Sequence, residues 1–317
     1  AASLVSTSVF AGELTATGSA SLAVEGYTGT GLASDTAFSM GDSVILSGST
    51  ELDNGMTVTM SFELDGTSES TVSGLSAYDD NSLTISSDAM GTMKFSAHGG
   101  SSASSALDTT AAGDMWDNFD GTANTLTVAG SATKAAGAGN NSIFYTLPSM
   151  VDGLAVSTSL NTTGTTGNSA LGYSATYSGV DGLSVSYGIA DVNSGLASTS
   201  GDQTAMKASY AYGPVTLSYS NSEYTLGSGA TEAAQQDVTS YAVSYTVSDA
   251  LSVTYGTETI ESGLAGSVDA EYQGVTVAYT AGGMTVTAKS QEADAISHTS
   301  ASNEDYDYWS LGLSFAF

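Results

Sequence analysis

Cysteine is absent from the sequence, and proline is almost absent, with two residues in 317. Without cysteine, neither a disulfide framework nor a thiolate metal site can form. Apolar runs of about 18 residues are missing too, which excludes a transmembrane helix but leaves open a protein that spans a membrane with strands. Because glycine, serine, threonine and tyrosine are abundant, the composition favours β structure over helices.

Positive charge is nearly absent as well. The formal net charge is -29, and nucleic acid or anionic lipid headgroups are excluded as partners because both require clustered cations. Strong acidity can accompany disorder, but 9% aromatic residues and a clear apolar period indicate a folded chain. The few basic residues are all lysines, at Lys94, Lys134, Lys207 and Lys289.

Histidine is also scarce, with only His98 and His298. Two histidines cannot supply the ligand set of a metal hydrolase, and they give a Ser–His pair little material. The glycine-rich stretch GSGATE (227–232) lacks the lysine that a phosphate-binding loop needs. The sequence therefore predicts no catalytic residues, and we expect a protein that is not an enzyme.

What the sequence does contain is an alternation of apolar and small polar residues. Segments such as VTLSYS, YAVSYTV, LSVTYG and VTVAYT repeat with a period of two, which predicts β-strands. Short turn signals join these segments in pairs. The turns are expected at 52–56, 87–91, 147–153, 178–182, 212–215, 247–251 and 280–284.

Longer, acidic stretches rich in glycine and serine alternate with the short turns. Together they separate sixteen strands and place all long connections at one end of the sheet. This is the plan of an outer-membrane barrel, so the sequence predicts an all-β, 16-stranded antiparallel transmembrane β-barrel over residues 12–317, with short periplasmic turns and long acidic external loops. The long stretches lie at about 26–42, 65–81, 98–141, 161–170, 189–204, 221–238, 257–269 and 290–307.

The two faces of the predicted strands differ in chemistry. One face is small and polar with few charges, whereas the other is apolar and edged with aromatic residues. In a membrane barrel, the apolar face contacts lipid, aromatic girdles mark the interfaces, and the polar face lines the lumen. The girdle residues are expected to be Tyr173, Tyr177, Tyr187, Tyr210, Tyr212, Tyr219, Tyr241, Tyr245, Tyr255, Tyr279, Tyr308 and Trp309.

Residues 1–11 differ from the rest of the chain. They are uncharged and mildly apolar, and they close on Val9-Phe10-Ala11, a small-residue pattern like a signal-peptidase site. We interpret them as the remnant of a secretory signal peptide. An additional short strand or an expression remnant is the alternative.

The last segment, WSLGLSFAF (309–317), is predicted to be a strand that pairs with the first strand near 13–26. In this segment and in NNSIFYTLPSMVDGLAVSTSL (140–160), the chain resembles the general porins of the Gram-negative outer membrane, especially the alphaproteobacterial branch. The resemblance implies a water-filled channel for passive diffusion of small hydrophilic solutes, a homotrimer in outer-membrane lipid, and a role for Phe317 as a C-terminal assembly signal.

The resemblance also assigns a role to the longest connection, 98–141. In porins, the loop after the fifth strand folds into the barrel and forms the constriction. An external, solvated loop is the alternative, although long structureless loops are usually functional or disordered. The candidate constriction residues in this loop are Asp108, Asp114, Asp117, Asp120 and Trp116, with Phe119 as a second aromatic anchor.

Porins of this kind commonly face the acidic loop with arginines, and this sequence has none. Strand parity instead places Lys94, Lys207 and Lys289 on the lumen side, together with Glu63. The three lysines form a sparse cluster or lie at separate heights; the sequence leaves both open, and Lys134 could pair with a neighbouring aspartate. Because carboxylates far outnumber cations, we expect a cation-preferring channel.

Calcium is the remaining question. Neighbouring carboxylates occur at Asp79 and Asp80, and again at Asp305 and Asp307, and hard oxygen ligands suit Ca²⁺. We expect no required cofactor, with structural Ca²⁺ as an option. A secreted, calcium-dependent surface-layer or adhesin-like β protein is the competing hypothesis, although irregular loop lengths oppose a repeat architecture.

Overall fold

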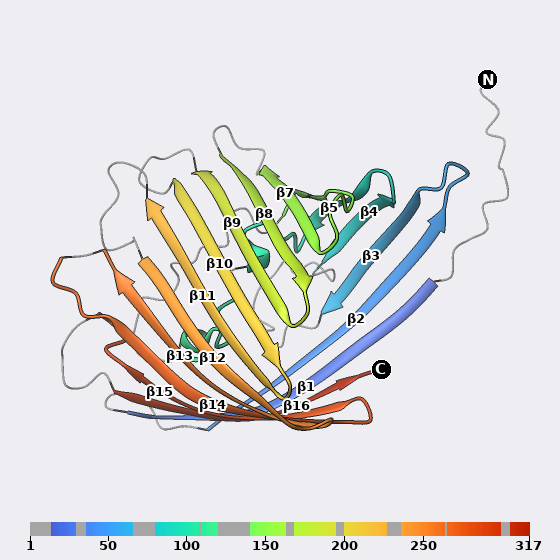
Figure 1. The fold of residues 1–317 in the computed structure, drawn as a ribbon. Coiled ribbons are helices and arrows are strands. Elements are labelled where there is room, and N and C mark those ends of the chain that lie inside the picture. The colour runs from blue at the N-terminus through green and yellow to red at the C-terminus, as the bar shows by residue number, and fades with distance from the viewer. Residues whose placement is uncertain are drawn as a thin grey trace, which may run out of the picture.

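The computed structural model describes residues 14–29, 36–65, 80–107, 109–119, 140–162, 168–194, 200–226, 236–263, 265–298 and 305–317. The described strands form one closed antiparallel barrel (Figure 1). The strands are β1 Leu14–Gly29, β2 Ala37–Glu51, β3 Thr57–Asp65, β4 Asn81–Ser87, β5 Gly91–His98, β6 Ser142–Thr146, β7 Leu154–Thr162, β8 Asn168–Val180, β9 Leu183–Ser194, β10 Gly201–Tyr212, β11 Val215–Leu226, β12 Gln236–Ser248, β13 Leu251–Ser262, β14 Ala270–Ala281, β15 Met284–Asp294 and β16 Tyr306–Ala316.

Each strand pairs with its neighbours along the chain, and the predicted 16-stranded antiparallel barrel is confirmed. Two short 3-10 helices, η1 Ser105–Leu107 and η2 Met115–Phe119, lie between β5 and β6. No helix in the described part of the chain is long and apolar enough to cross a bilayer. The proposed signal remnant, residues 1–11, lies outside the described residues.

The barrel closes where β16 returns to β1, as the sequence predicts. Val24 pairs with Leu311, and the pairing continues to the last residue. The Phe317 amide donates to the Gly18 carbonyl (2.9 Å), and the Gly18 amide donates to the Phe317 carbonyl (2.7 Å). A side chain at Gly18 would collide with the Phe317 ring, because an added Cβ would lie 2.4 Å from Cε2. The closing seam therefore includes the C-terminal aromatic residue.

The strand register separates the two faces as predicted. Ser220, Ser240 and Glu258 lie directly opposite one another on β11, β12 and β13, and all three point inward. Their chain neighbours point outward, where the Tyr219 and Tyr241 rings pack 5.1 Å apart. Outside, where a soluble protein would be polar, the tyrosines and leucines are exposed to the bilayer.

One residue assigned to the aromatic girdle faces the other way. Tyr308 on β16 is 4% exposed, points into the barrel and donates its hydroxyl to Glu25 (2.9 Å). The prediction was wrong for this residue because Tyr308 and Trp309 are consecutive, and consecutive residues of a strand point to opposite faces. Trp309 is the member of the pair that lies outside.

The long connections are shorter than the sequence suggested, because strands extend into them. β9 continues to Ser194, β11 to Leu226 and β13 to Ser262, all inside stretches expected to be loops. The acidic and hydroxylated residues in these stretches resemble loop composition. They fit a strand equally well once it projects beyond the hydrocarbon layer, where its outward side chains contact water. The expected short turns are confirmed.

Register irregularities occur at three places in the described ladders. The β-ladders shift between Asn81 and Ser82, between Tyr177 and Val180, and between Thr246 and Ser248. Gly274 pairs regularly with Gly256 and Gln291. Strand parity is therefore continuous through β13, β14 and β15.

The outer surface of the barrel has two unlike sides. On β2–β5 most outward residues are aliphatic, Met or Phe, the exceptions on β2 being Asp42, Gly48 and Thr50, and the strands β4 and β5 are short. On β8–β14 the outward face carries the tyrosine girdle and ends in carboxylates near the long connections. Exposed residues on the first side include Phe38, Met40, Val44, Met60, Leu64 and Leu83.

Candidate functional site

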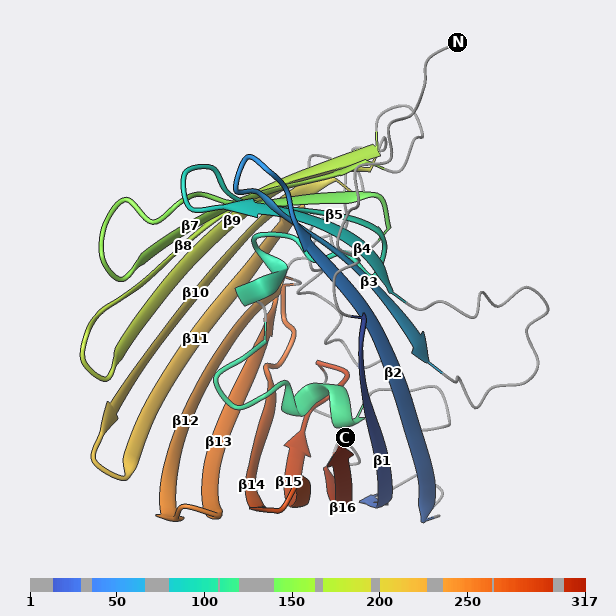
Figure 2. The same ribbon diagram turned by 90° about the vertical axis from the view of Figure 1, so that its right-hand side faces the viewer.

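The connection between β5 and β6 turns into the barrel instead of away from it. We call residues 99–141 the inner loop; the structure describes 99–107, 109–119 and 140–141 of it. Figure 2 shows η1 and η2 of this loop inside the ring of strands. The hydrogen bonds below reach the wall from β7 around to β1.

Serine hydroxyls on the wall hold the first part of the inner loop. The Ala103 amide donates to Ser159 Oγ on β7 at 2.8 Å. The Ala111 amide donates to Ser220 Oγ on β11 (2.8 Å), and the Ala112 amide donates to Ser240 Oγ on β12 (3.0 Å). These bonds replace the water that would otherwise solvate loop amides inside a barrel. The small polar side chains of the inner face thus serve as acceptors for the loop backbone.

A buried carboxylate holds the middle of the loop. Glu258 on β13 is 1% exposed and accepts hydrogen bonds from the Thr110 hydroxyl and from the Trp116 amide (3.2 Å). Asp114 stabilises the same turn from within the loop, since its Oδ1 accepts from the Thr110 amide at 2.8 Å. Charge-assisted hydrogen bonds of this kind are the stronger ones in proteins. Glu258 is therefore the main polar anchor of the turn that leads into η2.

The end of η2 reaches the far wall. Asn118 Nδ2 donates to Gln291 Oε1 on β15 (3.0 Å), and Lys289 Nζ donates to Asn118 Oδ1 (3.4 Å). Across the barrel seam, the Tyr27 hydroxyl donates to the Asn118 carbonyl at 2.8 Å. One residue of the loop thereby bonds to β15 and to β1.

An aromatic cluster inside the barrel packs around Phe119. Its ring is 1% exposed and lies 5.7 Å from the Tyr272 ring and 6.0 Å from the Tyr308 ring, centroid to centroid. Tyr27 packs on Tyr308 in turn, at 5.1 Å. Met115 is buried in the same cluster. Phe119 is thus an apolar anchor, as the sequence predicted for the aromatic pair, whereas Trp116 is only half-buried beside the cluster.

Glycines on the wall make room for the loop. A Cβ added at Gly256 on β13 would lie 2.6 Å from the Ala112 Cβ. At Gly188 on β9, an added Cβ would lie 3.0 Å from Leu107 Cδ1 and 3.5 Å from Ser104 Cα. Larger residues at these wall positions would push the loop away, so the close approach depends on glycine.

The loop carboxylates predicted to form the constriction divide into two groups. Asp114 is half-buried and bonded within the loop, whereas Asp117, in the first turn of η2, is exposed. Asp108 and Asp120 lie outside the described residues, as does Lys134. Among the described acids of the loop that were predicted for the constriction, Asp117 is therefore the one whose exposed carboxylate can interact with ions in the lumen.

The three candidate lysines face the lumen but lie far apart. Lys94 is on β5, Lys207 on β10 and Lys289 on β15, so several strands separate each from the next in the closed barrel. These three lysines therefore do not form the sparse cluster that the sequence left open. Glu63 is also on the inner wall, where it accepts a hydrogen bond from Ser43 at 2.5 Å.

The calcium candidates are not brought together either. Asp80 precedes β4, while Asp305 and Asp307 lie at the start of β16, and Asp79 is outside the described residues. Asp307 accepts a hydrogen bond from the Thr28 hydroxyl (3.0 Å). Within the described ranges, no group of three or more His, Asp or Glu residues is arranged to hold a metal ion.

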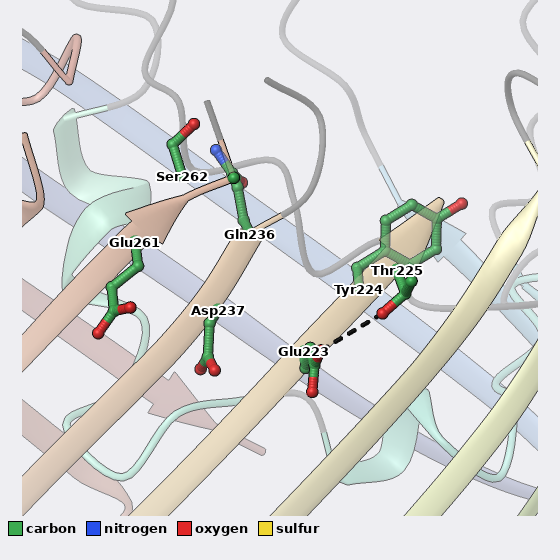
Figure 3. A pocket seen from close by; sticks show the side chains of 8 residues that line it. Glu223, Tyr224, Thr225, Gln236, Asp237, Glu261 and Ser262 are labelled. Carbon is green, nitrogen blue, oxygen red and sulfur yellow. Dashed lines mark hydrogen bonds between the residues drawn. The ribbon is translucent and has the colours of Figure 1, made fainter. Parts of the chain in front are cut away.

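A row of outward carboxylates marks the long-connection ends of three strands. Glu223, Asp237 and Glu261 lie directly opposite one another on β11, β12 and β13 (Figure 3). Glu223 accepts a hydrogen bond from the Thr225 hydroxyl (3.3 Å), and Asp237 accepts one from Asn221. Like charges directly opposite one another destabilise a sheet, and lipid would make the cost far larger. This row therefore places the strand ends beyond the hydrocarbon layer.

Sequence reasoning missed the residues that receive the inner loop. Glu258 fell in a stretch assigned to an external loop, and Gln291 fell in another. The local pattern gave no signal for Glu258, because the two apolar residues of YGTETIES (255–262), Tyr255 and Ile260, point to opposite faces of β13. An acidic residue in a polar stretch usually indicates an exposed loop, but Glu258 points into the barrel from within β13. The sequence pattern therefore predicted too early an end for this strand.

A closed barrel with an apolar, tyrosine-rich exterior, a small polar interior and a loop tethered inside defines a channel protein of the outer membrane. The chain belongs to the Gram-negative porin family, whose family model matches residues 1–317. It is accordingly a protein of the bacterial outer membrane. A comparison with curated protein sequences found no match.

Solved porins share this fold at low sequence identity. The anion-selective porin from Comamonas acidovorans has a TM-score of 0.69 and 16% identity, covering 96% of this chain and 99% of that one. A mutant of the Rh. blastica porin has a TM-score of 0.67 and 17% identity, covering 96% and 100%. Salmonella typhi OmpF in complex with daunomycin has a TM-score of 0.73 and 15% identity, covering 97% and 98%. The competing surface-layer hypothesis is wrong, since the barrel is closed and the whole chain matches the porin family.

Proposed function

We propose that this porin is a passive, cation-preferring diffusion channel whose constriction is formed by the inner loop. The observation that carries the proposal is the tethering of residues 103–119 across the inside of the barrel. A loop held there narrows the lumen and brings its side chains close to passing solutes. Selection then depends on the width of the passage and on the charges that line it.

The charge balance supports the cation preference. The chain carries a formal charge of -29, and Asp117 lies exposed on η2. Acidic groups in a low-dielectric passage raise the local concentration of cations and repel anions. The Comamonas acidovorans relative is described as anion-selective, so the fold permits either preference and the lining charges decide it.

Planar-bilayer recording of the purified protein in a KCl gradient tests this proposal. The reversal potential should favour K⁺, and the preference should grow as salt falls from about 1 M to about 0.1 M, because the screening length grows from about 3 Å to about 10 Å. Asp117→Asn should weaken the preference without closing the channel. A reversal potential that favours Cl⁻ at low salt would contradict cation preference.

We further propose that the protein is a homotrimer and not an enzyme. The outward face of β2–β5 supports the trimer, since it lacks the tyrosine girdle that marks contact with the membrane interfaces. Phe317 is proposed as the assembly signal, in keeping with its place at the closing seam. No cofactor is proposed as a requirement, and structural Ca²⁺ at Asp79–Asp80 or Asp305–Asp307 stays a prediction.

A further inference from the structure

Lys207 lines a cavity on the inner wall that the constriction does not account for. The cavity has a volume of about 390 Å³ and lies where β9, β10 and β11 meet the inner loop. Loop residues Leu107, Thr110 and Ala111 cover it on one side. Its size is within the range of small-molecule pockets, roughly 300–1,000 Å³.

Strand register arranges the wall of this cavity in two rows. In the row nearer the loop, Lys207 lies between Ser186 and Ser220, and Ser220 is occupied by the Ala111 amide. In the row nearer the short turns, Ser209 lies between Ser184 and Ser218. The side chains at all these positions point into the barrel, so the cavity opens to the lumen on the short-turn side of the inner loop.

Lys207 and the serines of the row nearer the short turns are available to a solute. Among the described residues, none forms a hydrogen bond with the hydroxyls of Ser184, Ser209 or Ser218, and none pairs with the Lys207 ammonium. Each hydroxyl can both donate and accept, while the ammonium offers up to about three donors. The cavity therefore offers one positive charge beside three hydroxyls that have no hydrogen-bond partner among the described residues.

We propose that this cavity is a binding subsite for hydroxylated carboxylates, the class to which sugar acids belong. Lys207 pairs with the carboxylate, and Ser184, Ser209 and Ser218 bind the solute hydroxyls. The solute is held beside the inner loop on the short-turn side of the constriction. The subsite rests on the proposed channel function, because it delays a solute that is already inside the lumen.

The ligand class follows from the chemistry of the wall. Lys207 is the charged residue among those that line the cavity, and a charge-assisted hydrogen bond from its ammonium to a carboxylate is stronger than a neutral one. A carboxylate without hydroxyls, such as acetate, leaves the serine row unused. The subsite should therefore prefer gluconate to acetate.

Single-channel recording with potassium gluconate or potassium acetate added to KCl tests the subsite. Gluconate should cause transient blockades, and Lys207→Met should raise the concentration needed for half-block about tenfold or more, as expected on losing a charge-assisted hydrogen bond. Ser209→Ala should have a smaller effect in the same direction. Acetate should block the wild-type channel more weakly than gluconate.

Lys94→Gln is the matched control, because it removes the same charge from the lumen five strands away from β10. It should shift the reversal potential but keep the gluconate blockades. Unchanged blockades in Lys207→Met, an equal loss in Lys94→Gln, or equal blocking by acetate would each overturn the subsite.

The reversal potential in KCl alone is read from the same recordings and tests the cation preference separately. Saturation-transfer NMR on detergent-solubilised protein tests gluconate binding to the subsite without measuring conduction. Gluconate signals should be saturated in the wild type and reduced in Lys207→Met. Equal saturation in both proteins would overturn the proposal even where the channel conducts.

Discussion

Glu258 joins the inner loop to the wall through a single buried side chain. It accepts from the Thr110 hydroxyl in a buried hydrogen bond and from the Trp116 amide in a partly buried one. The serine acceptors Ser240 and Ser220 lie on one side of it, on β12 and β11. The loop is thus held by one strong acceptor and by weaker ones beside it.

Removing that acceptor should loosen the loop. Glu258→Ala leaves one buried donor and one partly buried donor without this partner, which should cost about 2–4 kcal/mol of loop tethering. Single-channel current should become noisier and its mean larger, while the barrel stays folded. Glu261→Ala removes an outward carboxylate from the same strand and should leave the current unchanged. Wild-type noise in Glu258→Ala would show that the serines alone hold the loop.

At the scale of elements, the loop and the wall fit because β13 is glycine where the loop crosses. Ala112 occupies the space that a side chain at Gly256 would need. The neighbouring hydrogen bond from the Ala112 amide to Ser240 depends on this close approach. The absence of a side chain at Gly256 on β13 thereby sets how far the loop extends into the lumen.

Filling that position should move the loop toward the centre of the channel. Gly256→Val places a methyl-bearing Cβ within 2.6 Å of the Ala112 Cβ, and overpacking of this kind costs about 1–3 kcal/mol. Mean conductance should fall. Gly48→Val is the control, because no atom lies within 4 Å of a Cβ added there. If conductance is unchanged in Gly256→Val, the loop does not set the width.

Element by element, the sequence predicted strands and short turns well and strand ends poorly. Period-two alternation and glycine turns are local signals, so strands such as β11 and β14 could be located from a few residues. The outer strand ends, by contrast, are acidic, and Glu258 or Glu261 resembles a loop residue until the membrane level is known. The loop anchors are non-local, because pairing Trp116 with Glu258 depends on closure of the whole barrel.

At the scale of the whole molecule, the outer surface is asymmetric. The side formed by β2–β5 is mainly aliphatic and includes the short strands β4 and β5, while β8–β14 carry tyrosines and a row of outward acids. Tyrosines occur where a surface meets both lipid and water. A side that lacks them is suited to contact with another copy of the chain.

Site-specific crosslinking tests this contact, and the natural absence of cysteine makes the experiment clean. Met60→Cys on β3 labelled with benzophenone-maleimide should yield crosslinked oligomers after illumination in the membrane. Leu217→Cys on β11 is the matched control, because Met60 is 49% exposed and Leu217 is 52% exposed. Leu217→Cys should give monomers. Monomers from both variants would contradict an interface on β2–β5.

The anchoring of the inner loop also constrains the order in which the chain can fold. Ala103 bonds to a residue 56 positions later, Ala112 to one 128 later and Asn118 to one 173 later. These partners do not exist as a wall until the second half of the barrel has formed, and distant contacts are the slowest to be made. The inner loop can therefore form these hydrogen bonds only as each strand of the wall is added, from β7 first to β15 last. If the barrel closed before these bonds formed, the inner loop would remain outside the lumen. We therefore expect the barrel wall and the constriction to form together.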